Sequence, residues 1–123
     1  MIQGSGNTVE ILDFKTDKKP DITTEEGKES VRRYRRQLEI YSHIVQQRYG
    51  LTVSKMHLFY TGTEGASPFV SYDFNPSAIE QTINQVTDVV TKIENKDFER
   101  KAPRNPKHCV ECDLKFMCDH KCK

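Results

Sequence analysis

Two apolar segments with the character of β-strands, residues 8–14 and 53–60, stand on either side of one long helical stretch. This stretch, residues 30–49, repeats apolar side chains at helical spacing and stops at Gly50. Two strands joined by a single helix lie parallel, through a right-handed crossover, in nearly all known cases. The sequence therefore predicts a strand–helix–strand unit at the centre of the fold.

The following segments extend this unit. Residues 68–74 are expected to form a strand that pairs antiparallel with the strand over 53–60. Asn75 is the predicted N-cap of a helix over 76–94, because a proline follows it at the first helical position. We therefore predict an α/β fold in which a mixed sheet is flanked by helices.

Composition limits the size of the core and the type of compartment. The chain has 123 residues, of which 30% are charged and 35% hydrophobic, so we expect one domain or a large piece of one. It shows no signal peptide pattern and no apolar stretch of the ~20 residues that a membrane span needs. We therefore expect a cytoplasmic protein without a membrane partner, in which cysteines favour metal binding over disulfides.

The first strand delivers an acid and a lysine two residues apart, in the run Asp13-Phe14-Lys15. Side chains alternate along a strand, so Asp13 and Lys15 share one face, while Leu12 and Phe14 are expected to point into a core. A carboxylate beside an ammonium can hold a divalent cation and activate a water. Taken alone, the same pair is more often a surface ion pair.

Gln37 and Tyr41 lie four residues apart on the predicted helix and therefore share a face. Tyr41 also belongs to the apolar stripe of this helix, so core packing is an alternative role for its ring. Gln37 lies beside the stripe and needs a partner for its amide group. We expect this pair to meet Asp13 and Lys15 in one pocket.

The last residues predict a separate metal-binding segment. We divide the chain into a core over 1–107 and a cysteine segment over 108–123. A zinc ribbon has two C-x₂-C pairs, and this segment has one. Its four cysteines are Cys109, Cys112, Cys118 and Cys122.

A strand ending in D-F-K-T, a helix with Q-x-x-x-Y and a terminal cysteine cluster, in this order, resemble a known nuclease domain. It is the RecB-type domain of the PD-(D/E)XK superfamily, in the version fused to UvrD/Rep-type DNA helicases. The resemblance extends from Val9 to Cys118 and implies a restriction-endonuclease-like sheet. It also implies a Mg²⁺- or Mn²⁺-dependent deoxyribonuclease, of exonuclease or other type, that acts in DNA repair or recombination. DNA and the helicase domain of the same parent chain would be its partners.

The resemblance assigns a role to each residue of the predicted pocket. Asp13 and the backbone carbonyl of Phe14 would be metal ligands, and Lys15 would position or activate the attacking water. Gln37 and Tyr41 would border the site and contact the DNA or the catalytic groups.

A basic run in the helix is expected either to neutralise DNA phosphates or to be a solvated face. The candidates for phosphate contact are Arg32, Arg33 and Arg36.

In the helicase-linked nucleases, a C-x₂-C-x₅-C segment supplies three thiolates of a [4Fe–4S] cluster. By resemblance, Cys109, Cys112 and Cys118 would be these ligands, with a structural role. Cys122 has no counterpart and would either substitute as a ligand or remain a free thiol. We favour the cluster over zinc, with loss of the cluster or its replacement by zinc as alternatives for this chain.

One family feature is missing. In the family a preceding strand carries another metal-binding acid, whereas the only acid before Asp13 is Glu10, which would face the opposite side of the strand. Residues 1–3 are expected to be the end of that preceding strand, joined by a turn at 4–7. The chain thus resembles the C-terminal part of the domain, truncated on its N-terminal side. We expect weak or absent cleavage by this chain alone, and self-association through an open sheet edge.

Two other functions compete with the nuclease. One is a non-catalytic, nuclease-like domain that binds DNA or a helicase and keeps a structural Fe–S or zinc site. The other is a cysteine-cluster interaction module unrelated to nucleases.

Overall fold

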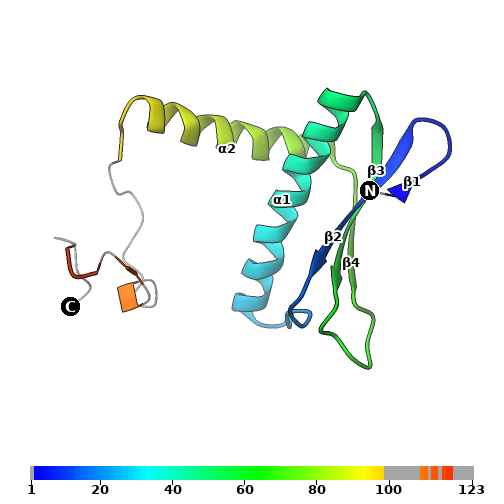
Figure 1. Ribbon diagram of the computed structural model, residues 1–123, viewed down its shortest axis with the longest axis horizontal. Coiled ribbons are helices and arrows are strands. Elements are labelled where there is room, and N and C mark those ends of the chain that lie inside the picture. The colour runs from blue at the N-terminus through cyan, green and yellow to red at the C-terminus, as the bar shows by residue number, and fades with distance from the viewer. Residues whose placement is uncertain (1, 99–108, 111, 114, 118–123) are drawn as a thin grey trace. The chain divides into compact units, whose positions relative to one another are not determined.

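The computed structural model describes residues 2–98, 109–110, 112–113 and 115–117. The chain divides into two compact units, Met1–Val90 and Thr91–Lys123. The expected domain boundary between residues 107 and 108 lies outside the described residues. The elements are, in chain order, β1 (Ile2–Gln3), β2 (Thr8–Lys15), α1 (Glu25–Tyr49), β3 (Thr52–Tyr60), β4 (Phe69–Asp73) and α2 (Pro76–Glu94) (Figure 1).

The strands form one mixed sheet in the order β1-β2-β3-β4. Strands β2 and β3 are parallel, and each of them has an antiparallel neighbour on its outer side, β1 and β4 respectively. The predicted parallel crossover, the antiparallel strand that follows it and the short strand before the first turn are all confirmed. The α/β class with a mixed sheet and helices is confirmed as well.

Helix α1 begins and ends at capping residues. The hydroxyl of Thr24 accepts a hydrogen bond from the Gly27 amide at 3.0 Å, and Gly50 ends the helix with a left-handed φ of 64°. The helix therefore starts at Glu25, ahead of residue 30, where the apolar periodicity begins. The difference arises because the cap, and not the apolar stripe, determines the first turn.

The core lies between α1 and the face of the sheet that this helix contacts. It is formed by side chains from α1 and from the two central strands: Leu38, Val9, Ile11, Val53, Met56, Leu58 and Tyr60.

The expectation that Leu12 and Phe14 point into the core is wrong. The buried side chains of β2 are Val9 and Ile11, which share their face with Asp13 and Lys15. Leu12 is half-buried, and Phe14 is 63% exposed on the opposite face. Because both faces of β2 carry apolar residues, only the position of α1 decides which face is buried.

The opposite face of the sheet carries an aromatic row across three strands. The ring of Phe59 lies 5.6 Å from that of Phe14 and 4.8 Å from that of Phe69, each with edge-to-face geometry. Both flanking rings are largely exposed.

Helix α2 has the predicted bounds. Its first turn is capped by Asn75, whose side-chain oxygen accepts a hydrogen bond from the Ala78 amide at 3.1 Å. Ile79 and Thr82 are buried, whereas Val86 and Val90 further along are exposed. No helix in the described part of the chain is long and apolar enough to cross a membrane.

Candidate active site at the end of strand β2

Four side chains form one chain of contacts where β2 ends beside α1. Lys15 Nζ lies 2.7 Å from Asp13 Oδ2 and donates a hydrogen bond of 2.9 Å to Gln37 Oε1. Gln37 Nε2 in turn donates to the hydroxyl of Tyr41 at 2.7 Å. The four residues that the sequence places in one pocket therefore lie together.

The ammonium group of Lys15 is held from several sides. It lies 4.0 Å from the ring centroid of Tyr34, a cation–π contact, and its side chain is only 13% exposed. The Lys15 carbonyl accepts a hydrogen bond from the Thr61 amide at 2.8 Å, which fixes the end of the strand. These contacts orient the positive charge toward Asp13 and Gln37.

Tyr34 is a further member of the cluster, which the sequence analysis did not include among the candidate site residues. It precedes Gln37 by three residues and Tyr41 by seven, so its place on their helix face is a signal that could have found it. The ring of Tyr41, by contrast, is not core: this residue is 39% exposed.

One oxygen of Asp13 is buried in the cluster. Asp13 Oδ2 has no properly directed hydrogen bond from any described residue, although Lys15 lies within ion-pair distance. The two observations agree, because an ion pair depends on separation and a hydrogen bond also on angle. This carboxylate oxygen is thus held by charge alone.

Below the cluster lies Tyr60, which is opposite Lys15 in the register of β2 and β3. Its hydroxyl is buried and has no hydrogen-bond partner among the described residues. Burial, with smaller contributions from nearby Tyr72, Tyr34 and Asp13, raises the pKa of Tyr60 to about 12. The phenol therefore stays neutral at any physiological pH.

The donor set for a divalent cation is incomplete within the described residues. Mg²⁺ takes oxygen ligands and keeps several waters. Asp13, with one oxygen free of directed hydrogen bonds, fits as a ligand. The described residues contain no group of three or more His, Cys, Asp or Glu side chains placed to hold a metal. Ligation by Asp13 and by the carbonyl of Phe14 stays a prediction.

Glu10 does not join the cluster, as expected from its position on β2. It lies on the opposite face, where its Oε2 is 3.1 Å from His57 Nε2. The other ring nitrogen of His57 is 2.8 Å from the hydroxyl of Ser71. This polar group connects three strands and is separate from Asp13.

The three candidate phosphate-binding arginines lie on different parts of α1. The guanidinium of Arg33 lies 5.5 Å from the ring of Tyr34, next to the cluster. Arg32 forms an exposed ion pair of 2.7 Å with Glu29. Arg36 lines a pocket on another flank of the helix. Contact of these residues with nucleic acid stays a prediction.

The cysteine segment is described only in part. Cys109 is half-buried and disulfide-bonded, and Cys112 is a half-buried free thiol. Cys118 and Cys122 lie outside the described residues. A cysteine in a disulfide cannot ligate iron or zinc in the same state, so metal binding at Cys109 requires its reduction. Ligation by this segment stays a prediction.

One comparison with known proteins gives a match. A family model described as the PD-(D/E)XK nuclease superfamily matches residues 1–119, nearly the whole chain. No curated protein and no solved structure gives a significant match. The mixed sheet with its helices is consistent with the restriction-endonuclease-like fold, and the D-x-K of Asp13 and Lys15 stands at the end of a central strand. The chain therefore belongs to the PD-(D/E)XK nuclease superfamily.

Proposed function

We propose that this chain is the catalytic module of a metal-dependent DNA nuclease that hydrolyses phosphodiester bonds. The observation that carries the proposal is the continuous contact from Asp13 through Lys15 and Gln37 to Tyr41. It joins a carboxylate, the ordered ammonium group of Lys15 and two polar side chains at one partly exposed position. Superfamily membership supports a nuclease-type function independently.

Each side chain has a role that follows from its contacts. Negative charge develops on the phosphate oxygens during hydrolysis, and the Lys15 ammonium, oriented by Gln37 and Tyr34, would stabilise it. The hydroxyl of Tyr41 accepts from Gln37, so its own proton remains available for a phosphate oxygen. Asp13 would be a ligand of Mg²⁺ or Mn²⁺, which when bound polarises the phosphate and lowers the pKa of a water.

Lys15 and a bound cation would compete for Asp13. In this structure Lys15 neutralises Asp13 Oδ2 at 2.7 Å. With a cation on that carboxylate, Lys15 would give up this contact, keep its hydrogen bond to Gln37, and become available to the attacking water or the phosphate.

We propose that the 123-residue chain cleaves DNA weakly or not at all by itself. The support is the donor set: a single carboxylate holds Mg²⁺ weakly, because the ion gives up its water reluctantly. The second acid would come from elsewhere in the intact parent protein.

We also propose the setting of that parent. By its resemblance to the RecB-type domains, it would be a cytoplasmic helicase–nuclease for DNA repair or recombination. Its helicase domain would be the partner in the same chain. Cys109, Cys112 and Cys118 would hold a structural [4Fe–4S] cluster, with zinc as the alternative. Colourless parent protein with stoichiometric zinc after anaerobic purification would favour zinc.

The test compares two acid-to-amide substitutions on the same strand. In the intact parent with Mg²⁺ and labelled linear DNA, Asp13→Asn should lower the cleavage rate by at least about 100-fold. Glu10→Gln, on the opposite face, should leave the rate within twofold. Cleavage by the Asp13→Asn protein at the unmodified rate would overturn the nuclease proposal.

A second function is favoured by one observation, the incomplete donor set. If the parent also lacks a further acid, the chain would be a non-catalytic domain that binds DNA or a helicase. A parent that binds DNA without cleaving it at any Mg²⁺ or Mn²⁺ concentration would support this alternative.

A further inference from the structure

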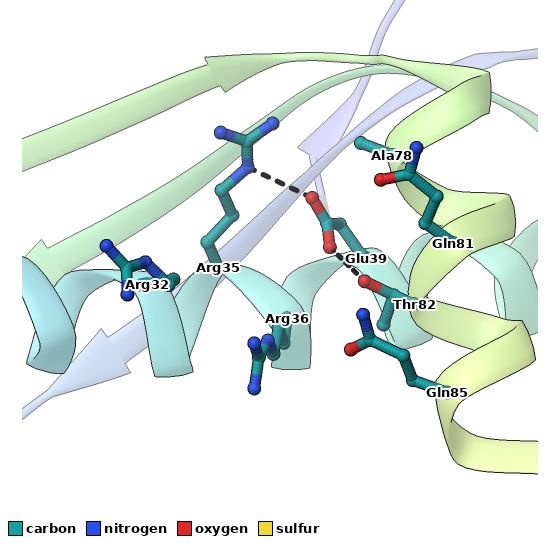
Figure 2. A pocket seen from close by; sticks show the side chains of 8 residues that line it. All are labelled: Arg32, Arg35, Arg36, Glu39, Ala78, Gln81, Thr82 and Gln85. Atoms are coloured by element: carbon teal, nitrogen blue, oxygen red, sulfur yellow. Dashed lines mark hydrogen bonds and ion pairs between the residues drawn. The ribbon is translucent and has the colours of Figure 1, made fainter. Parts of the chain in front are cut away.

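A pocket of about 270 Å³ lies between α1 and the first half of α2 (Figure 2). Residues of α1 two positions from Gln37 lie about 160° around the helix from it, so Arg35 and Glu39 are on the far side from the active-site cluster. The pocket therefore belongs to a different surface. Its lining includes three arginines, two glutamines and one carboxylate: Arg32, Arg35, Arg36, Gln81, Gln85 and Glu39.

The wall of the pocket is fixed by a buried carboxylate. Glu39 is 4% exposed and accepts from Arg35 Nε at 3.0 Å and from the Thr82 hydroxyl at 2.6 Å (Figure 2). The guanidinium of Arg35 also lies 5.1 Å from the ring of Tyr72. Of these contacts, the Thr82–Glu39 hydrogen bond is the one that joins α2 to α1, and it places Gln81 and Gln85 on the same pocket as Arg36.

Three of the other polar side chains in the pocket lack a partner among the described residues. Arg36 makes no ion pair or hydrogen bond with another described residue, and neither do Gln81 and Gln85. The two glutamines lie four residues apart, so both project from the same face of α2 (Figure 2). Arg32 is tied only to the exposed Glu29, a type of pair that contributes little.

The charged and polar side chains that line the pocket indicate the class of ligand that it would bind. Glu39 is the only carboxylate among the lining residues, and two partners already occupy it. What the pocket offers is a guanidinium with parallel N–H groups and two amide N–H₂ groups. A phosphate, with several acceptor oxygens and a negative charge, can accept from all of these donors at once.

We propose that this pocket binds a backbone phosphate of the DNA strand, at a distance from the phosphate to be cleaved. The inference rests on the proposed nuclease function and adds a second contact with its substrate. Helix α1, which is about 10–12 Å across with its side chains, separates the pocket from the Lys15 cluster. The bound phosphate would therefore be a different one from the phosphate that is cleaved.

The test measures binding without cleavage, with the 123-residue chain in EDTA. In ¹H–¹⁵N spectra, inorganic phosphate and a labelled single-stranded oligonucleotide should both shift the side-chain signals of Arg36, Gln81 and Gln85. Shifts with inorganic phosphate alone would overturn the DNA assignment in favour of a small phosphate compound. Absence of shifts with both would overturn the site.

A charge-matched pair of variants completes the test. Arg36→Gln should weaken oligonucleotide binding about tenfold and reduce the slope of log affinity against log salt by about one. Arg48→Gln removes the same charge from an exposed position of α1 outside the pocket and should change affinity less than twofold. Equal effects of the two variants would show only general electrostatic attraction and would contradict the proposal.

The two proposals fail separately. If Arg36→Gln binds DNA normally while Asp13→Asn abolishes cleavage in the parent, only the pocket assignment is lost. If Asp13→Asn cleaves normally while the oligonucleotide still shifts the Arg36 signals, the nuclease assignment is lost and phosphate binding remains.

Discussion

Two carboxylates on strand β2, Asp13 and Glu10, are three residues apart and lie in opposite surroundings. Asp13 is on the face covered by α1, where its side chain is 22% exposed. Glu10 is on the other face, where it meets His57, and its side chain is 35% exposed. Each acid has a basic partner, and the set of contacting side chains around each acid includes a hydroxyl group. The difference is that a helix supplies Gln37, Tyr41 and Tyr34 to only one of them.

This comparison shows that the packed helix, more than the acid itself, makes the candidate active site. Under α1, Lys15 exchanges water contacts for a carboxylate, an amide oxygen and an aromatic ring. Charges interact more strongly there, because less water screens them. On the open face Glu10 is somewhat more exposed than Asp13, at 35% against 22%, while the basic partners His57 and Lys15 are about equally buried.

The largest expected effect comes from removing the charge at the covered site. In the longer nuclease proposed above, Lys15→Met should lower the rate of DNA cleavage by about 100- to 1,000-fold, a range typical of losing one group that stabilises transition-state charge. The measurement is single-turnover cleavage of labelled DNA at saturating Mg²⁺.

The matched change on the open face is His57→Gln, which removes the ring between Glu10 and Ser71. It should leave the rate within threefold. If both variants lost activity equally, the distinction between the two faces would be wrong.

The two faces should also differ in stability. Ile11→Ala removes a core side chain that is 6% exposed and should lower the free energy of unfolding by about 2–4 kcal/mol. Phe14→Ala removes a ring that is 63% exposed and should cost about 1 kcal/mol or less. Urea unfolding of the 123-residue chain, followed by circular dichroism, gives both values. A larger loss for Phe14→Ala would mean that the aromatic row is covered in solution.

A smaller effect is expected from the amide that orients the lysine. Gln37→Leu keeps the size of the side chain but loses the hydrogen bonds to Lys15 and Tyr41, so cleavage by the proposed longer nuclease should fall about tenfold. Gln46→Leu, near the other end of α1, serves as the control for a generic change on this helix. Unchanged cleavage by Gln37→Leu would mean that Asp13 and Tyr34 position Lys15 without the amide.

Much of this fold follows from local pattern, because its signals are local. Asn75 and Gly50 predicted one helix start and one helix end correctly, since a cap acts on its own helix. The joint position of Lys15 and Gln37 was also predictable, because a crossover helix must pack on the strands that it connects.

Other features depend on contacts that are distant in sequence. Leu12 and Ile11 are equally apolar, so alternation could not show which of them would be buried. The hydrogen bond of Thr82 to Glu39 joins residues separated by 43 positions, and no short sequence pattern predicts it. The arginine pocket depends on this bond and was therefore visible only as a basic run. The family resemblance supplied the chemistry of Asp13 and Lys15, which spacing alone leaves ambiguous.

The smallest expected effect lies beneath the covered site and depends on pH. The buried Tyr60 hydroxyl has no hydrogen-bond partner among the described residues, so Tyr60→Phe should raise the free energy of unfolding by about 1 kcal/mol at neutral pH.

The pKa of Tyr60 is about 12 in the folded chain, and a tyrosine in an unfolded chain has a pKa of about 10. Tyr60 therefore causes no pH-dependent change in the free energy of unfolding below about pH 10. As the pH rises toward 12 it lowers this free energy, because the unfolded chain then releases a proton that the folded chain keeps. Unfolding curves between pH 8 and 12 should thus show a smaller alkaline loss for Tyr60→Phe than for Tyr49→Phe, which changes a tyrosine that is 61% exposed. Identical alkaline losses in the two variants would mean that water reaches the phenol, and that the floor of the Lys15 cluster is as hydrated as the face that carries Glu10.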